Sequence, residues 1–169
     1  MEGEELKIGS FDEFMNPTPV TTQEEKSEKE TLEDRFSKER FSWSSKIKTL
    51  SGRLSSVEGT SQLMTEIYTE RQLALEYYHY IISLLVKINK SYNKQYSEKY
   101  KFYKYNSQER LPNDNLIKIR INSELEEIKE KREILDNHAK FMDGTVKTID
   151  NIIYGIKYKV EITQIGRGK

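Results

Sequence analysis

The segment KYKFYKY, residues 99–105, alternates lysines with aromatic rings. Lysine ammonium groups pair with phosphates without reading base sequence, and aromatic rings stack on unpaired bases for roughly 1–3 kcal/mol per base. The pattern is therefore typical of a surface that contacts single-stranded nucleic acid. Its candidate contact residues are Lys99, Lys101, Phe102, Lys104 and Tyr105.

The wider segment, residues 76–105, holds eight tyrosines and six lysines, and a helix would separate most of them onto two faces. At about 100° per residue, four tyrosines fall within about 80° of one another, and most lysines fall roughly opposite. The tyrosine stripe comprises Tyr92, Tyr96, Tyr100 and Tyr103, in line with Ile81, Leu85 and Ile88. These tyrosines are predicted to extend a helical core, which leaves residues 99–105 as the candidate nucleic-acid surface.

Residues that could perform catalysis or bind a metal lack partners at the required spacing. His79 and His138 each stand alone, with no second histidine at metal-ligand spacing along a helix. The chain has no cysteine, and neither a nucleophile elbow nor a phosphate-binding glycine loop is present. We therefore expect no enzyme activity, no metal, no cofactor and no small-molecule substrate.

The composition favours long helices over a compact globule, because only 35% of the 169 residues are apolar and 33% are charged. Long helices bury only a stripe of each surface. No apolar run approaches the roughly 20 residues needed to cross a bilayer, and the N-terminus lacks the apolar segment of a signal peptide. We therefore expect a cytoplasmic protein with no membrane contact.

The net charge of zero conceals an uneven distribution of charge along the chain. Residues 1–34 carry eleven acids and three lysines, a net charge of −8, whereas residues 35–169 carry 25 basic and 17 acidic groups, a net charge of +8. Residues 1–30 are predicted to form an acidic, mostly disordered arm. The arm either competes with a polyanion for the basic part of the chain or only aids solubility.

Glycine, proline and the apolar spacing divide the rest of the chain into helices. Pro112 and the following Asn113, Asp114 and Asn115 predict a turn that also supplies a helix cap. The expected elements are a short helical segment within 31–58 capped by Thr31, a helix over about 60–106, a turn over 107–115, a helix over about 115–163, and a basic flexible tail over 164–169.

The second long helix carries a heptad seam, a row of side chains that alternate in steps of four and three from Ile121 to Val160. A heptad pattern of this length is typical of a coiled coil. The sequence therefore predicts an all-α antiparallel hairpin over 60–165, roughly 65–70 Å long, that assembles as a homo-oligomer. The residues assigned to contacts between copies are Leu135, Met142, Val146, Ile149, Ile153, Ile156 and Val160.

Two segments resemble the UvsY-type recombination mediators of T-even-like phages. KYKFYKYNS, residues 99–107, is similar to the end of the family's first long helix, with Lys99 and Lys101 at its basic pair. FMDGTVKTIDNIIYGIKYKVEI, residues 141–162, is similar to its last helix, with Lys157 closing the pattern. Asn106 and Ser107 stand where the family has a glycine.

The resemblance implies a non-enzymatic oligomer that binds single-stranded DNA in the host-cell cytoplasm. It would help to load a phage recombinase onto DNA covered by single-strand-binding protein. The alternative from the heptads alone is a structural or scaffolding coiled-coil protein without DNA affinity. A membrane-remodelling hairpin is a third reading, which the acids on the second helix oppose because they repel anionic lipid.

Overall fold

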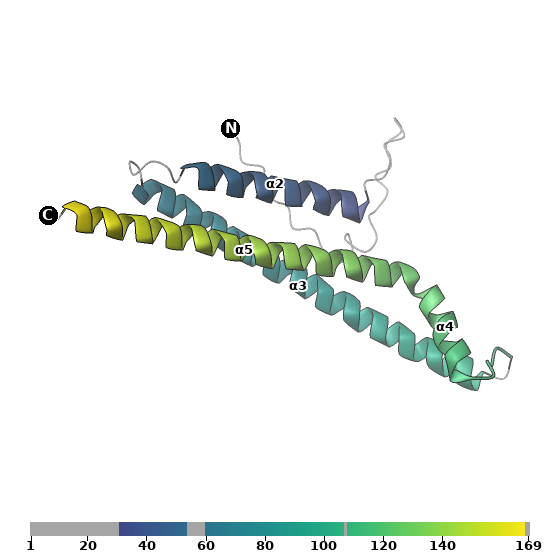
Figure 1. The fold of residues 1–169 in the computed structure, drawn as a ribbon. Coiled ribbons are helices and arrows are strands. Elements are labelled where there is room, and N and C mark those ends of the chain that lie inside the picture. Colours follow the sequence, from purple (N-terminus) through teal and green to yellow (C-terminus); the bar gives the residue numbers. More distant parts are fainter. Residues whose placement is uncertain (1–30, 54–59, 107, 168–169) are drawn as a thin grey trace, which may run out of the picture. The chain divides into compact units, whose positions relative to one another are not determined.

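The computed structural model describes residues 31–53, 60–106 and 108–167 of the chain. Within these residues the fold is entirely helical, which confirms the predicted all-α class. The helices are α2 (Leu32–Gly52), α3 (Thr60–Tyr105), α4 (Asp114–Glu124) and α5 (Glu126–Arg167) (Figure 1). The predictions for the acidic arm, for residues 54–58 and for the last two residues lie outside the described part.

Helix α2 begins at a capping box formed by Thr31 and Asp34. Thr31 Oγ1 accepts a hydrogen bond from the Asp34 backbone N–H, and the Asp34 carboxylate accepts one from the Thr31 N–H, both at 3.1 Å. This reciprocal arrangement satisfies two donors that a helix start leaves unpaired. Phe36, Trp43 and Leu50 recur every seven residues and are buried. Helix α2 therefore packs through one narrow stripe.

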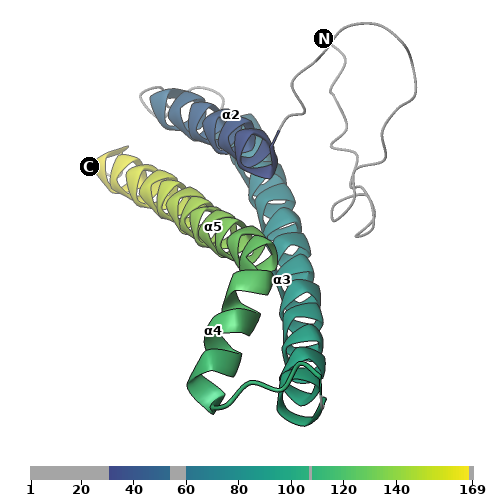
Figure 2. The same cartoon turned by 90° about the vertical axis from the view of Figure 1, so that its right-hand side faces the viewer.

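Helices α3 and α5 run antiparallel, as an ion pair near each end of their contact shows. Arg71 of α3 lies 2.5 Å from Asp150 of α5, whereas Lys99, later in α3, lies 2.6 Å from Glu124, just before α5. Residue numbers thus rise along one helix as they fall along the other. Figures 1 and 2 show α2 beside the first half of α3 and beside α5.

The second long helix is broken at Leu125, where the sequence analysis expects one helix over about 115–163. Leu125 has φ −103° and ψ 13°, outside helical values, although its N–H still donates to the Ile121 carbonyl at 2.9 Å. The break turns α4 away from the axis of α5 (Figure 2). Ile117, Ile121 and Leu125 thereby pack against Tyr103 at the end of the hairpin.

At its other end, α5 continues to Arg167. The prediction of a flexible tail is therefore wrong for residues 164–167. The heptad seam of α5 faces the interior of a single chain. Six of the seven residues assigned to contacts between copies are buried, and Val160 is half-buried. A second copy would therefore have to bind elsewhere or displace a helix.

Candidate nucleic-acid interface

The five residues predicted to contact nucleic acid do not form one surface. Lys99 is half-buried on the side of α3 that faces α4, whereas Phe102 and Tyr105 are 45% and 75% exposed. Lys101 is also exposed. The basic pair, Lys99 and Lys101, therefore points in two directions, as expected for residues two positions apart on a helix.

Lys99 is part of an ionic cluster around Glu124. The Glu124 carboxylate accepts hydrogen bonds from Lys99 Nζ at 2.6 Å, from Arg120 Nε at 2.7 Å and from the Tyr103 hydroxyl. The hydrogen bond from Lys99, followed by the one from Tyr103, lowers the pKa of Glu124 from 4.5 to about 2. Lys99 thus ties α3 to the end of α4, and a phosphate would have to compete with Glu124 for it.

Replacing Glu124 by glutamine is expected to destabilise the protein at pH 7 but not near pH 2. A carboxylate whose pKa is lowered by folding stabilises the fold above its unfolded pKa of 4.5. That stability is lost as the pH falls through about 2. Because Glu124 is half-buried and partly screened, we expect a loss of about 1–2 kcal/mol at pH 7.

Thermal unfolding followed by circular dichroism across pH 2–7 measures this effect. Glu127→Gln is the matched control, since its side chain is 79% exposed and pairs with Lys131 one turn away. A Glu124→Gln difference that is the same at every pH would contradict the assignment.

Lys104 is also engaged within the chain. Its Nζ donates a hydrogen bond to the Tyr100 hydroxyl at 3.1 Å, lies 5.1 Å from the centre of that ring, and lies 3.7 Å from Asp114. The bond to Tyr100, followed by the charge of Asp114, raises the pKa of Lys104. A phosphate would have to compete with these contacts, so Lys104 is a secondary candidate at most.

The exposed side of α3 extends the candidate surface from residues 99–105 toward the N-terminus of the helix. Lys90 and Lys94 are exposed on the face that Lys101 also occupies, and Tyr105 ends the same row. Of the described helices, α4 and α5 lie beside the second half of α3 (Figure 1). We define the basic face of α3 as Lys90, Lys94, Lys101 and Tyr105. From the sequence, most lysines of α3 fall opposite the tyrosine stripe, but the predicted site is confined to residues 99–105.

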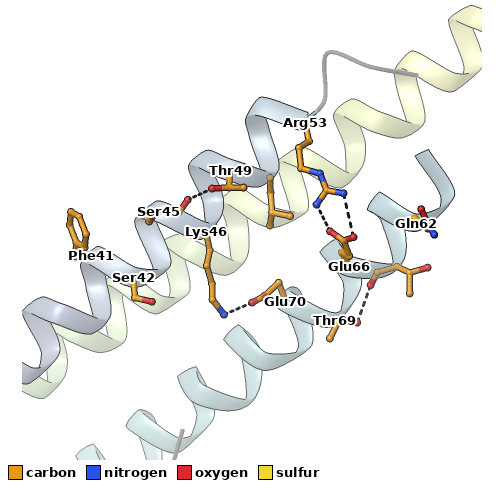
Figure 3. A pocket seen from close by; sticks show the side chains of 12 residues that line it. Phe41, Ser42, Ser45, Lys46, Thr49, Arg53, Gln62, Glu66, Thr69 and Glu70 are labelled. Atoms are coloured by element: carbon orange, nitrogen blue, oxygen red, sulfur yellow. Dashed lines mark hydrogen bonds and ion pairs between the residues drawn. The ribbon is translucent and has the colours of Figure 1, made fainter. Parts of the chain in front are cut away.

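A groove of about 820 Å³ lies between α2 and α3 (Figure 3). Two ion pairs span it, one between Lys46 and Glu70 at 2.9 Å and one between Arg53 and Glu66. Phe41 and Leu50 are its large apolar residues, and small hydroxyl side chains line much of the rest. Its charged groups are thus already paired across the two helices and give no distinct ligand chemistry.

A buried polar cluster joins the three main helices. His138 of α5 is completely buried, and its Nε2 lies 3.3 Å from the Glu39 carboxylate of α2, which also accepts a hydrogen bond from the Tyr77 hydroxyl of α3. The Phe36 ring stacks on His138 with centroids 4.1 Å apart. Burial raises the pKa of Glu39, but its contacts with His138 and Tyr77 outweigh burial and lower it overall.

This cluster was not expected from sequence, which treated His138 as an ordinary helix-face histidine. Its partner Glu39 is about 100 residues away on another helix, so no local spacing could reveal it. Burial of Tyr77, followed by the negative charge of Glu39, raises the tyrosine pKa. The cluster links α2 to α3 and α5, and only the edge of Glu39 reaches solvent.

No protein-family model matches the chain, and neither do the curated proteins or solved structures with which it was compared. Among the described residues, no group of three potential metal-ligating side chains lies close together. None of the described helices is long and apolar enough to pass through a bilayer. Any function must therefore be inferred from the surface of α3 itself.

Proposed function

We propose that this chain binds single-stranded DNA along the basic face of α3. The observation that supports this is the row of Lys90, Lys94 and Lys101, all exposed, on one side of a helix that ends in the exposed ring of Tyr105. The only acid among the exposed α3 residues from 86 to 105 is Glu98, against four lysines including Lys87. This surface therefore carries an excess of three positive charges.

The spacing of this row suits a flexible polyanion better than a rigid one. At about 1.5 Å per residue, the steps from Lys90 to Lys94 and from Lys94 to Lys101 are about 6 and 10 Å along the helix axis. A single strand can adjust its backbone to such unequal steps. Tyr105, and Phe102 on the flank of the row, offer rings on which its bases can stack.

Titrating the protein into a fluorescently labelled deoxythymidine oligonucleotide at several salt concentrations tests this function. We expect an affinity that falls as salt rises, because each neutralised phosphate releases counterions. Binding should exceed that to a duplex of equal length, since only the single strand presents free base faces. Absence of binding at low salt would reject the proposal.

We also propose a more specific role, that of a recombination mediator, which the resemblance to UvsY-type proteins supports. In this role the chain is a non-enzymatic homo-oligomer with coiled-coil character, acting in the host-cell cytoplasm. It would load a strand-exchange recombinase onto DNA covered by single-strand-binding protein. Faster recombinase assembly on covered DNA in its presence would support the role, and an unchanged rate with DNA binding intact would reject it.

A structural or scaffolding protein is the second candidate, favoured by the large apolar side chains that the described helices leave exposed. Tyr154, Tyr158 and Ile165 are each more than 65% exposed on α5. A scaffold needs such contact surfaces but no affinity for DNA. Recovery of the chain from purified particles, together with no binding to the oligonucleotide, would favour this candidate.

Deleting residues 1–30 is expected to tighten binding to the oligonucleotide if the acidic arm competes for the basic face. The segment has nine acids and three lysines, a net charge of −6, and the deletion leaves the capping box of Thr31 and Asp34 intact. We expect a gain in affinity of roughly threefold to tenfold at low salt that disappears at high salt. An unchanged affinity would show that the arm only aids solubility.

A further inference from the structure

A second apolar stripe runs along α5 on the side away from the core. Its members are Tyr154, Tyr158, Ile162 and Ile165, with exposed fractions of 68%, 67%, 52% and 72%. We call these four residues the outer stripe. At about 100° per residue they lie within about 80° of one another and roughly opposite the buried Ile149, Ile153 and Ile156. Neither α2 nor α3 can cover them.

The side chains of the outer stripe have nearly the same spacing whether they are followed from its N-terminal end or from its C-terminal end. Tyr154 and Ile165 are its ends, and Tyr158 and Ile162 lie between them. The midpoint between Tyr154 and Ile165 and the midpoint between Tyr158 and Ile162 both fall close to residue 160. A two-fold axis near residue 160 would therefore place each tyrosine against an isoleucine of an antiparallel copy.

We propose that a second copy of this chain docks on the outer stripe, with the two α5 helices antiparallel about residue 160. The inference deepens the homo-oligomer proposed above and assigns it to a surface other than the buried heptad seam. It does not depend on DNA binding. The interface is isologous, so each copy contributes the same four residues to a closed pair.

The charged side chains beside the outer stripe also support a second copy of this chain as its partner. Lys157 and Glu161 lie on the same flank of the outer stripe, and their midpoint, residue 159, is one residue from that axis, so they face each other across the two copies with an offset of about 3 Å along the helices. Two Lys157–Glu161 pairs would therefore form, one on each side of the axis. Among the described residues, neither side chain has an ion-pair partner within its own chain, although Lys157 lies 6.0 Å from the Tyr154 ring centre.

The exposed area of the outer stripe is consistent with a modest dimer. Four large side chains that are about two-thirds exposed present on the order of 500 Å² per copy, or about 1,000 Å² for the pair. That total is close to the lower limit for a specific interface. We therefore expect a dimer whose population depends on protein concentration.

Analytical ultracentrifugation of the full chain without DNA tests the proposal. Wild-type protein is expected at twice the monomer mass at high concentration, and Tyr158→Lys with Ile162→Lys is expected to shift it to monomer. The matched control is Val86→Lys with Ile119→Lys, at positions 61% and 65% exposed on other helices. Unchanged helicity and melting temperature in both variants exclude unfolding as the cause.

Reversing the flanking charges tests the antiparallel orientation. Lys157→Glu alone and Glu161→Lys alone are each expected to raise the dimer dissociation constant about threefold to tenfold, because each places like charges opposite each other. The two substitutions together restore the pairing and are expected to return the constant near to its wild-type value. Additive losses in the double variant would overturn the proposed orientation.

Disulfide cross-linking gives an independent readout, since the chain has no cysteine of its own. Mixing a Tyr158→Cys chain with an Ile162→Cys chain is expected to give a cross-linked dimer faster than either variant alone. Faster cross-linking of Tyr158→Cys with itself would indicate parallel helices and overturn the proposal. A wild-type chain that stays monomeric would also overturn it, whatever the result of the oligonucleotide assay.

Discussion

Replacing Lys90, Lys94 and Lys101 together by alanine is expected to lower the affinity for single-stranded DNA by 10- to 100-fold at low salt. Each lysine neutralises about one phosphate and contributes roughly 0.7 to the magnitude of the slope of log affinity against log salt. Loss of all three lysines should therefore lower that magnitude by about 2. All three side chains are exposed, so the fold should be unaffected. Fluorescence anisotropy with a deoxythymidine oligonucleotide measures both quantities.

The matched control removes the same charge from other faces of the molecule. Lys48, Lys118 and Lys140 are also exposed but lie on α2, α4 and α5. Their replacement by alanine should weaken binding far less, through loss of net charge alone. Equal losses in the two triple variants would show that binding is not localised to α3. Lys99→Ala should leave the salt slope nearly unchanged, because Lys99 already pairs with Glu124.

Replacing Glu39 by leucine is expected to destabilise the protein by about 3 kcal/mol, which for a chain of this size lowers the melting temperature by about 6–12 °C. The substitution leaves the buried Tyr77 hydroxyl without its acceptor and removes the carboxylate that lies 3.3 Å from His138 Nε2. A polar group buried without a partner costs more than the hydrogen bond itself contributes. Urea or thermal unfolding followed by circular dichroism measures the loss.

A double substitution separates the lost hydrogen bond from lost packing. Adding Tyr77→Phe removes the stranded hydroxyl, so Glu39→Leu with Tyr77→Phe should be less destabilised than the sum of the two single variants, by about 1–2 kcal/mol. Glu76→Leu is the surface control, since its side chain is exposed on α3. Strict additivity would show that Glu39 and Tyr77 do not act together.

Features encoded over a few neighbouring residues could be predicted from the sequence. The start of α2 follows from the Thr31 cap, and the extent of α3 follows from an apolar stripe free of proline and glycine. The position of Lys99 near the tyrosine stripe also follows from helical geometry. Each of these depends on one helix alone, where 100° per residue fixes the side-chain directions.

Features that depend on how two helices align could not be predicted. The pairing of Lys99 with Glu124 and of Glu39 with His138 requires the relative positions of helices distant in sequence. For the same reason, periodicity could not distinguish a seam buried in one chain from a seam between copies. The break at Leu125 had no clear local signal either, because Ile117, Ile121, Leu125 and Ile128 follow steps of four, four and three that suit a continuous helix.

The uninterrupted length of α3 has a consequence for the thermodynamics of binding. The lysines of its basic face are fixed in relative position by a helix of 46 residues before any strand arrives. Little backbone entropy of the protein is lost on binding, in contrast to basic segments that fold only on their nucleic acid. Under the proposed function, the cost of ordering would fall instead on the single strand, and α3 would act as a preorganised template for it.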